Sequence, residues 1–244
     1  MSVILINPFI LAAGSSVAAA VDLDGSTEYL SKTFGSAGTS NKIFSLSFWI
    51  RRGGTGTTQQ VMMADAGGGN EDMLGFTTGN LLQFFRSGSP GITGTTAITS
   101  TSTWYHVLLA VDTSQATAAN RVRIYIDGTE ESYTGSAPTL DATFVGWAQA
   151  VAHQIGRNAA GNRHYLNGDL ALIHFIDGQQ LTPSSFYSGG QAIQYAGGYG
   201  TNGFHLDFAA GGDMGNDVSG NNHDFALTSI DGTDQLSDGP SKNY

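Results

Sequence analysis

The chain has 244 residues, a formal net charge of −10 and no cysteine, which excludes disulfides and thiolate metal sites. Lys and Arg total 10 against 20 Asp and Glu, so we expect no nucleic-acid partner. No apolar run approaches the roughly 18 residues of a membrane helix, and we expect no membrane partner. The 34 glycines lie well above a usual share of about 7 % and indicate many turns.

The N-terminus is predicted to be an apolar arm over residues 1–20, followed by one folded domain over 21–244. It lacks the Lys or Arg of a cleaved signal peptide, and a short strand over 3–6 is the alternative. The arm either folds back on its own sheet or docks on a neighbouring protein. We favour docking, and its expected contact residues are Ile4, Ile6, Pro8 and Phe9.

Strands are predicted wherever short runs with β-type alternation lie between Gly and Asx turns. In the first long run the face formed by Phe44, Leu46, Phe48 and Ile50 is wholly apolar and is expected to face the core. Many short strands predict an all-β, antiparallel two-sheet jelly-roll sandwich. The expected strands are 44–52, 59–65, 73–78, 81–86, 104–111, 121–127, 152–157, 169–177 and 203–208.

Helix is predicted only as one short turn. Thr182 can cap it, Pro183 takes the first helical position and Phe186 is expected to point inward. Residues 146–156 fit helix and strand equally well by periodicity.

Three stretches together resemble a known family: "FSLSFWIRR", "TWYHVLLAVDT...NRVRIYIDG" and "IGRN...YLNGDLALIHFIDGQQLTPSSF". They resemble the laminin-G-like, concanavalin-A-like sandwich in the version found in structural proteins of tailed bacteriophages. The later phrases "YGTNGFHLDFA" and "NDVSGNNHDFALTSI" resemble the same phage proteins.

This resemblance implies a virion structural protein on the exterior of the phage particle, most simply a capsid decoration or cement protein. Its partner would be the major capsid protein or another virion protein, and a homotrimer is the expected oligomer. The alternative is a tail-associated adhesin that recognises host surface glycan, and the third reading is a polysaccharide-degrading enzyme.

Catalytic residues are not predicted. Glycoside hydrolases with this sandwich carry two carboxylates that flank the scissile bond. Here Glu28 and Glu71 lie in loop-like contexts, while Glu130 and Glu131 are neighbours that would point to opposite faces of a strand. The sequence contains no G-x-S-x-G elbow. His106 and His174 fall within strands, where we expect them to be packed or hydrogen-bonded.

One acidic cluster, "NDVSGNNHD", leaves two readings open. Calcium binds carboxylate and carbonyl oxygens, but Asn and Asp also build Gly-rich turns without any ion. We favour turns and expect no cofactor; calcium is the ion that the cluster could hold. Its ligands would be Asp217, Asn221, Asn222 and Asp224.

Glycan binding would need an exposed aromatic platform with polar neighbours. Tryptophan is highly buried on average, so burial in the core or at an interface is the default expectation for the two Trp residues considered. The aromatic residues considered are Trp49, Trp147, Tyr133, Tyr195 and Tyr199.

Overall fold

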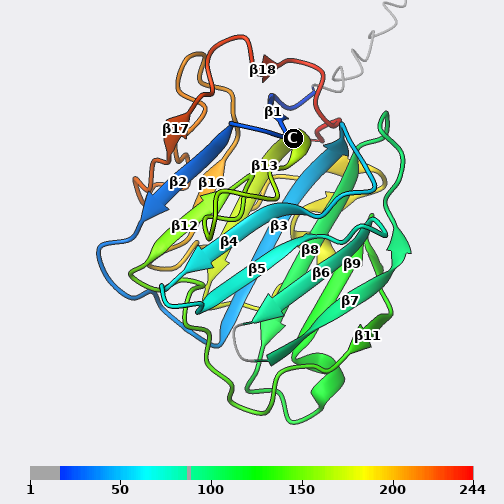
Figure 1. The fold of residues 1–244 in the computed structure, drawn as a ribbon, viewed down its shortest axis with the longest axis vertical. Helices are drawn as coiled ribbons and strands as arrows, with labels where there is room; N and C mark the ends of the chain where they lie inside the picture. The colour runs from blue at the N-terminus through cyan, green and yellow to red at the C-terminus, as the bar shows by residue number, and fades with distance from the viewer. Residues whose placement is uncertain (1–16, 87–88, 244) are drawn as a thin grey trace, which may run out of the picture.

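The computed structural model describes residues 17–86 and 89–243. The expected strand over 3–6 and the expected docking residues Ile4, Ile6, Pro8 and Phe9 lie outside these residues. Two large antiparallel sheets face each other, and the only helical elements among the described residues are two single 3₁₀ turns. The predicted all-β sandwich is confirmed (Figure 1).

The first sheet, here called the β3 sheet, has β13 near its centre. One edge of β13 pairs with β3, and its other edge is divided between β1 and β16. The strand order is β10 (Thr129–Glu130), β9 (Val122–Ile126), β8 (Tyr105–Asp112), β3 (Ile43–Arg52), β13 (Asn167–Asp177), β1 (Ala20–Asp24) and β18 (Gln235–Leu236), with β16 (Phe204–Leu206) beside β13.

The second sheet, here called the β4 sheet, contains the other long strands. Its order is β11 (Tyr133–Gly135), β7 (Ser89–Ala97), β6 (Leu81–Arg86), β5 (Glu71–Phe76), β4 (Gln59–Asp65), β12 (Ala152–Ile155), β2 (Tyr29–Thr33) and β17 (Ala226–Thr228). A small hairpin joins β14 (Tyr187–Ser188) to β15 (Gln191–Ala192). The 3₁₀ turns are η1 (Ala118–Asn120) and η2 (Pro183–Ser185). Within the described ranges, no helix is long and apolar enough to cross a membrane.

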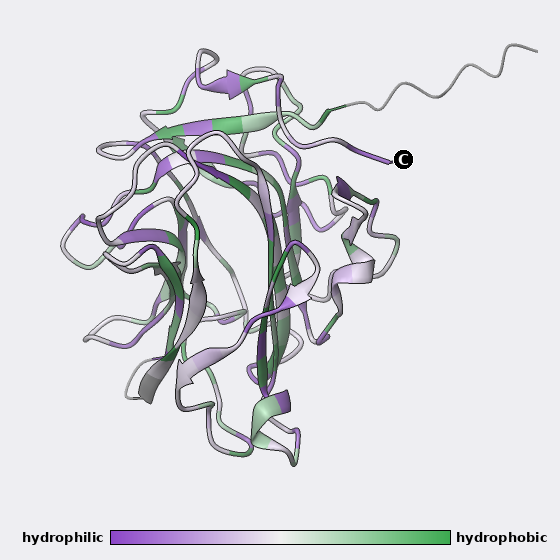
Figure 2. Ribbon diagram, turned by 90° about the vertical axis from the view of Figure 1, so that its right-hand side faces the viewer, coloured by the Kyte–Doolittle hydropathy of each residue, from purple (hydrophilic) through white to green (hydrophobic). Residues whose placement is uncertain are grey.

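The core lies between the two sheets, which Figure 2 shows as two layers. The predicted inward face of β3 is confirmed, because Phe44, Leu46, Phe48 and Ile50 are all buried there. Trp147 stacks on Phe44 and on Phe175 at ring separations of 5.6 and 6.1 Å, and those two phenylalanine rings lie 5.7 Å from each other. Large aromatic side chains from both sheets therefore supply much of the buried area.

The outer face of the β3 sheet is also covered. Trp49 packs there against Leu172 and Ala192, and Phe186 packs in a second cluster with Leu108 and Ile176. This second layer explains why β8 has two apolar faces: one faces the core, and the other faces the segment that follows β13.

The structure decides one open expectation and contradicts another. Residues 152–155 form a strand, whereas 146–151 form turns, and the Asp72 carboxylate accepts a 2.7 Å hydrogen bond from the Gly146 N–H. Thr182 does not cap η2 with its side chain; its Oγ1 lies 2.9 Å from the Ser184 hydroxyl instead. Phe186 is buried as predicted.

Candidate functional site

A cavity of about 460 Å³ opens on the outer face of the β3 sheet. Its floor comes from β13 and β16, and most of its wall comes from the chain between β15 and the C-terminal residues. It is lined by Ala19, Leu172, His174, Ile193, Gln194, Tyr195, Ala196, Gly197, Tyr199, His205, Asp207, Ala209, Val218, Ser219 and Lys242. A volume in the range of about 300 to 1,000 Å³ is typical of small-molecule sites.

Two histidines form the floor of this cavity. His174 of β13 and His205 of β16 are directly opposed in the antiparallel register, and their rings stack with centroids 3.9 Å apart. A register shift between Ala171 and His174, where Leu172 adopts a positive φ of 48°, sets this part of β13. The bulge therefore determines which side chains β13 presents to the cavity.

Both imidazoles are neutral at pH 7. Burial lowers the pKa of His205 to about 4, and burial together with the neighbouring His205 holds the pKa of His174 well below its usual value of 6.5. His174 Nδ1 lies 2.8 Å from the Tyr199 hydroxyl. The buried Nε2 of His205 has no hydrogen-bond partner within residues 17–86 and 89–243.

Two tyrosines form the aromatic wall. Tyr195 and Tyr199 meet edge to face, with ring centroids 5.3 Å apart. Tyr199 begins a turn that glycine makes possible: Gly200 has a φ of +76°, and a Cβ at Gly203 would collide with the Tyr199 carbonyl oxygen. The turn from 199 to 203 thus fixes the position of the Tyr199 ring.

Polar side chains complete the lining. Gln194 is exposed, while Asp207, Ser219 and Lys242 are half-buried. The Asp207 carboxylate accepts a 3.0 Å hydrogen bond from the Ala209 N–H. Aromatic faces together with several hydrogen-bonding groups suit a ligand that has both an apolar face and many hydroxyls.

The acidic cluster predicted as turn or calcium site braces this cavity. Both carboxylate oxygens of Asp217 accept hydrogen bonds, from the N–H groups of His205, Ser219 and His223 and from the Ser219 hydroxyl, at 2.8–2.9 Å. The Asn221 side chain donates to the carbonyls of Gly200 and Gly203, both at 2.8 Å. These contacts tie the cluster to β16 and to the Tyr199 turn.

The other two members of the cluster also have turn geometry. Asp224 Oδ1 accepts the Asp217 N–H at 2.9 Å, and Asn222 adopts a positive φ of 58°. Within the described chain, no group of three or more His, Cys, Asp or Glu is arranged to hold a metal ion. The geometry fits the turn reading, since donors of the protein already surround the carboxylates.

The aromatic residues considered from sequence separate into two groups. Trp49 and Trp147 are buried, as expected for tryptophan, and Tyr133 is half-buried at the edge of the β4 sheet. Only Tyr195 and Tyr199 line the cavity. His106 is hydrogen-bonded as predicted, with its Nε2 2.8 Å from the Ser47 hydroxyl.

The four glutamates do not form a catalytic pair. Glu28 accepts the Asp24 N–H at 2.6 Å, Glu131 accepts the N–H groups of Thr95 and Thr96, and Glu130 lies 3.6 Å from Arg123 Nε. Glu71 lies across the strand pair from Asp65 at the end of the β4–β5 hairpin.

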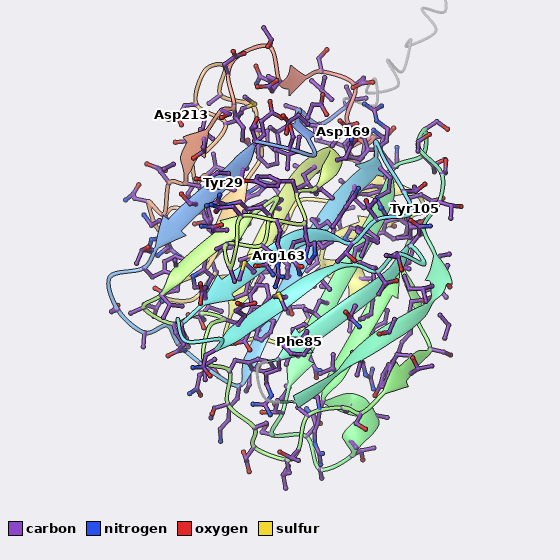
Figure 3. The ribbon with its side chains drawn as sticks, in the orientation of Figure 1. Tyr29, Phe85, Tyr105, Arg163, Asp169 and Asp213 are labelled. Carbon is purple, nitrogen blue, oxygen red and sulfur yellow. The ribbon has the colours of Figure 1, made fainter. Side chains whose placement is uncertain are left out.

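A carboxylate pair that the sequence patterns missed lies elsewhere. Asp22 of β1 and Asp169 of β13 are directly opposed, and Asp169 also contacts Arg51, which reaches Asp238 at 2.9 Å. Burial raises the pKa of Asp169 to about 6, and Asp22 adds to this rise although Arg51 opposes it. Figure 3 shows Asp169 at the end of the molecule where β1 lies. Strand register alone creates this pair.

The outer face of the β4 sheet offers a much smaller hollow of about 30 Å³. Gln60, Gln83, Met73 and Phe85 line it, and Figure 3 shows Phe85 and Arg163 on this side. The cavity over the β3 sheet is therefore the better candidate for a ligand site.

Comparison with known proteins identifies the fold. The sequence profile described as the Concanavalin A-like lectin/glucanases superfamily matches residues 24–185. No curated protein matches the chain. The match ends before most of the cavity wall, which begins at Ile193.

Solved structures share the fold at low sequence identity. A Bacteroides ovatus protein for which carbohydrate binding has been proposed is 15 % identical, with a TM-score of 0.64 over 92 % of this chain and 61 % of that one. The chain thus spans less than two thirds of that protein. The heptameric SAP-like pentraxin of Limulus polyphemus is 13 % identical, with a TM-score of 0.51 over 68 % of this chain and 78 % of that one.

Proposed function

The chain belongs to the concanavalin A-like lectin/glucanases superfamily, and on that premise we propose that it is a carbohydrate-binding structural protein on the exterior of a tailed-phage particle. It acts by binding and not by catalysis. The capsid shell is its proposed location, where it decorates or cements the lattice of the major capsid protein.

The observation that carries the binding function is the cavity over the β3 sheet. Tyr195 and Tyr199 provide aromatic ring surface on which the apolar face of a sugar can pack, and Gln194 and Ser219 provide hydrogen-bonding groups. Lectin-like sites combine such ring faces with a few placed polar groups. The Bacteroides ovatus neighbour, although similar only in fold, is compatible with this reading.

The positions of the acidic side chains support a non-enzymatic role. Retaining glycosidases need carboxyl groups about 5 to 5.5 Å apart around a sugar site. Of the carboxylates in the described chain, Asp207 alone lines the cavity, and the opposed pair Asp22 and Asp169 does not.

Binding can be tested with the purified full chain on an array of bacterial surface glycans. We expect at least one glycan to bind, and we expect Gln194→Ala and Tyr195→Ala to weaken that binding at least tenfold. Tyr133→Ala removes a tyrosine from the opposite sheet and should leave binding unchanged. Absence of binding to every glycan, or equal loss in all three variants, would contradict the proposal.

The location can be tested separately by cryo-electron microscopy of purified particles and by copy number. Hundreds of copies over the shell are expected of a decoration protein. A few copies at the tail would overturn the capsid assignment in favour of the adhesin, the alternative that the same cavity supports. Absence from particles would overturn both virion roles.

A further inference from the structure

We propose that the cavity over the β3 sheet selects uncharged sugars and discriminates against sugars that carry a carboxylate. This inference rests on the proposed carbohydrate-binding function and names the ligand class for the same site. The charges and hydrogen-bonding groups that line the cavity carry it.

The cavity is a feature of this chain's own C-terminal segment. Residues from Ile193 to Lys242 supply most of its wall, whereas the family match ends at residue 185. The brace formed by Asp217 and Asn221 positions the Tyr199 turn and β16 from the same segment. These residues therefore determine the selectivity of the cavity.

Among the described residues, the lining has one cationic side chain that can pair with a carboxylate, Lys242, and one carboxylate, Asp207, which offsets its charge. Proteins most often bind carboxylates with the bidentate guanidinium of arginine, and no arginine of the described chain lines the cavity. The two stacked histidines add no positive charge at neutral pH, because burial keeps both rings unprotonated. A chain with a formal net charge of −10 repels anions further.

The Asp207 carboxylate is the charged group that disfavours an acidic sugar. An anion would have to enter beside Asp207, where like charges repel in partly dehydrated surroundings.

The test uses sugar pairs that differ only at the carboxylate. Calorimetry or ligand-observed NMR on the full chain would compare glucose with glucuronic acid and galactose with galacturonic acid, as methyl glycosides, at pH 7. We expect the neutral member of at least one pair to bind at least tenfold more tightly than its acidic partner.

Charge variants identify the source of the discrimination. Asp207→Asn keeps an acceptor for the Ala209 N–H but removes the charge. It should reduce the ratio of the affinities for the neutral and the acidic sugar by at least threefold. Asp65→Asn is the matched control, because it removes the same charge from the β4 sheet and its amide can still accept the Gly67 N–H. It should leave the ratio unchanged.

The outcomes separate this inference from the function on which it rests. Equal or tighter binding of the acidic sugars would overturn the selectivity and leave carbohydrate binding intact. An unchanged ratio in Asp207→Asn, or an equal change in Asp65→Asn, would also contradict it. If neither member of any pair binds and the glycan array is blank, the proposed function fails and the inference fails with it.

Discussion

His174 and His205 stack face to face across the β13–β16 pairing, with ring centroids 3.9 Å apart. Two imidazoles at this separation cannot both be protonated without strong repulsion. Burial also lowers the pKa of both rings, so the floor of the cavity carries no charge at neutral pH.

Acidification should destabilise the protein between about pH 6.5 and pH 4. Burial lowers the pKa of His106 to about 3 and the pKa of both His153 and His205 to about 4. Since the folded pKa lies below the unfolded value of about 6.5, the unfolded chain binds more protons in this window and stability rises with pH. We expect the free energy of unfolding in urea to fall by several kcal/mol, on the order of 1–3 kcal/mol per histidine, from pH 7 to pH 4.5.

His153→Phe is the informative variant for this effect. The ring lies 4.7 Å from Phe34 in an aromatic cluster, so phenylalanine fits the surroundings but takes up no proton. The slope of stability against pH should become shallower by up to one proton. A slope identical to that of the natural chain would contradict the assignment.

Asp22→Asn should stabilise the protein at neutral pH. The folded pKa of Asp169, about 6, lies above its ordinary value of 3.8. The stability that Asp169 contributes is therefore fully present below about pH 4 and is lost as the pH rises through 6. Removal of the neighbouring charge should lower that pKa and add roughly 0.5 to 1.5 kcal/mol at pH 7, but almost nothing at pH 4. Thermal unfolding at both pH values measures this, with Asp213→Asn, an exposed carboxylate (Figure 3), as the charge-matched control.

Chelation should leave the melting temperature unchanged. The Asp217 carboxylate already accepts four hydrogen bonds from the protein, and these would have to break for calcium to bind there. Differential scanning calorimetry with and without EDTA checks this. A drop in Tm that calcium alone restores would show that the Asp217 to Asp224 cluster is a metal site after all.

Arg52→Ala should be strongly destabilising. The guanidinium is fully buried 3.9 Å from the centroid of the Phe76 ring, and it donates to Gln59 Oε1 and the Gly54 carbonyl at 3.1 and 3.0 Å. Truncation leaves a cavity and buried acceptors without donors, at a cost of about 2 to 4 kcal/mol. Arg163→Ala, at an exposed arginine, should change the unfolding free energy by less than about 0.5 kcal/mol. Equal effects would contradict the role of burial.

Deletion of residues 2–16 tests the expected docking arm. A longer deletion through residue 20 would also remove Ala18 and Ala20, which are buried against the β3 sheet, and would confuse docking with folding. The shorter variant should retain its β-type circular dichroism but lose binding to particles that lack the native protein. Normal binding would mean that Ile4, Ile6, Pro8 and Phe9 are not the contact.

The sequence patterns predicted the long strands because their alternation is strong. Phe44 to Ile50 repeats apolar residues at every second position, and the structure buries that face as expected. β7 was missed because Gly91, Gly94 and several threonines give it little apolar signal, so its strand depends on pairing with β6 and β11.

The cavity could be predicted only in part. Tyr195 and Tyr199 were considered for their residue type, but nothing local reveals that they lie above His174 and His205. That arrangement depends on β16 returning beside β13 and on the Asp217 brace, contacts between residues far apart in sequence. Local periodicity has no information about such pairings.

The pairing of β1 with β18 and of β2 with β17 joins strands from opposite ends of the described chain, as the blue and red ribbons of Figure 1 show. During synthesis on the ribosome the β4–β7 hairpins can form early, whereas β1 and β2 gain their second neighbours, β18 and β17, only when the chain is almost complete. Contacts of such long sequence separation slow folding and leave strand edges open in the meantime. Recombinant production should therefore gain soluble yield from slower translation or lower temperature more than from a stronger promoter.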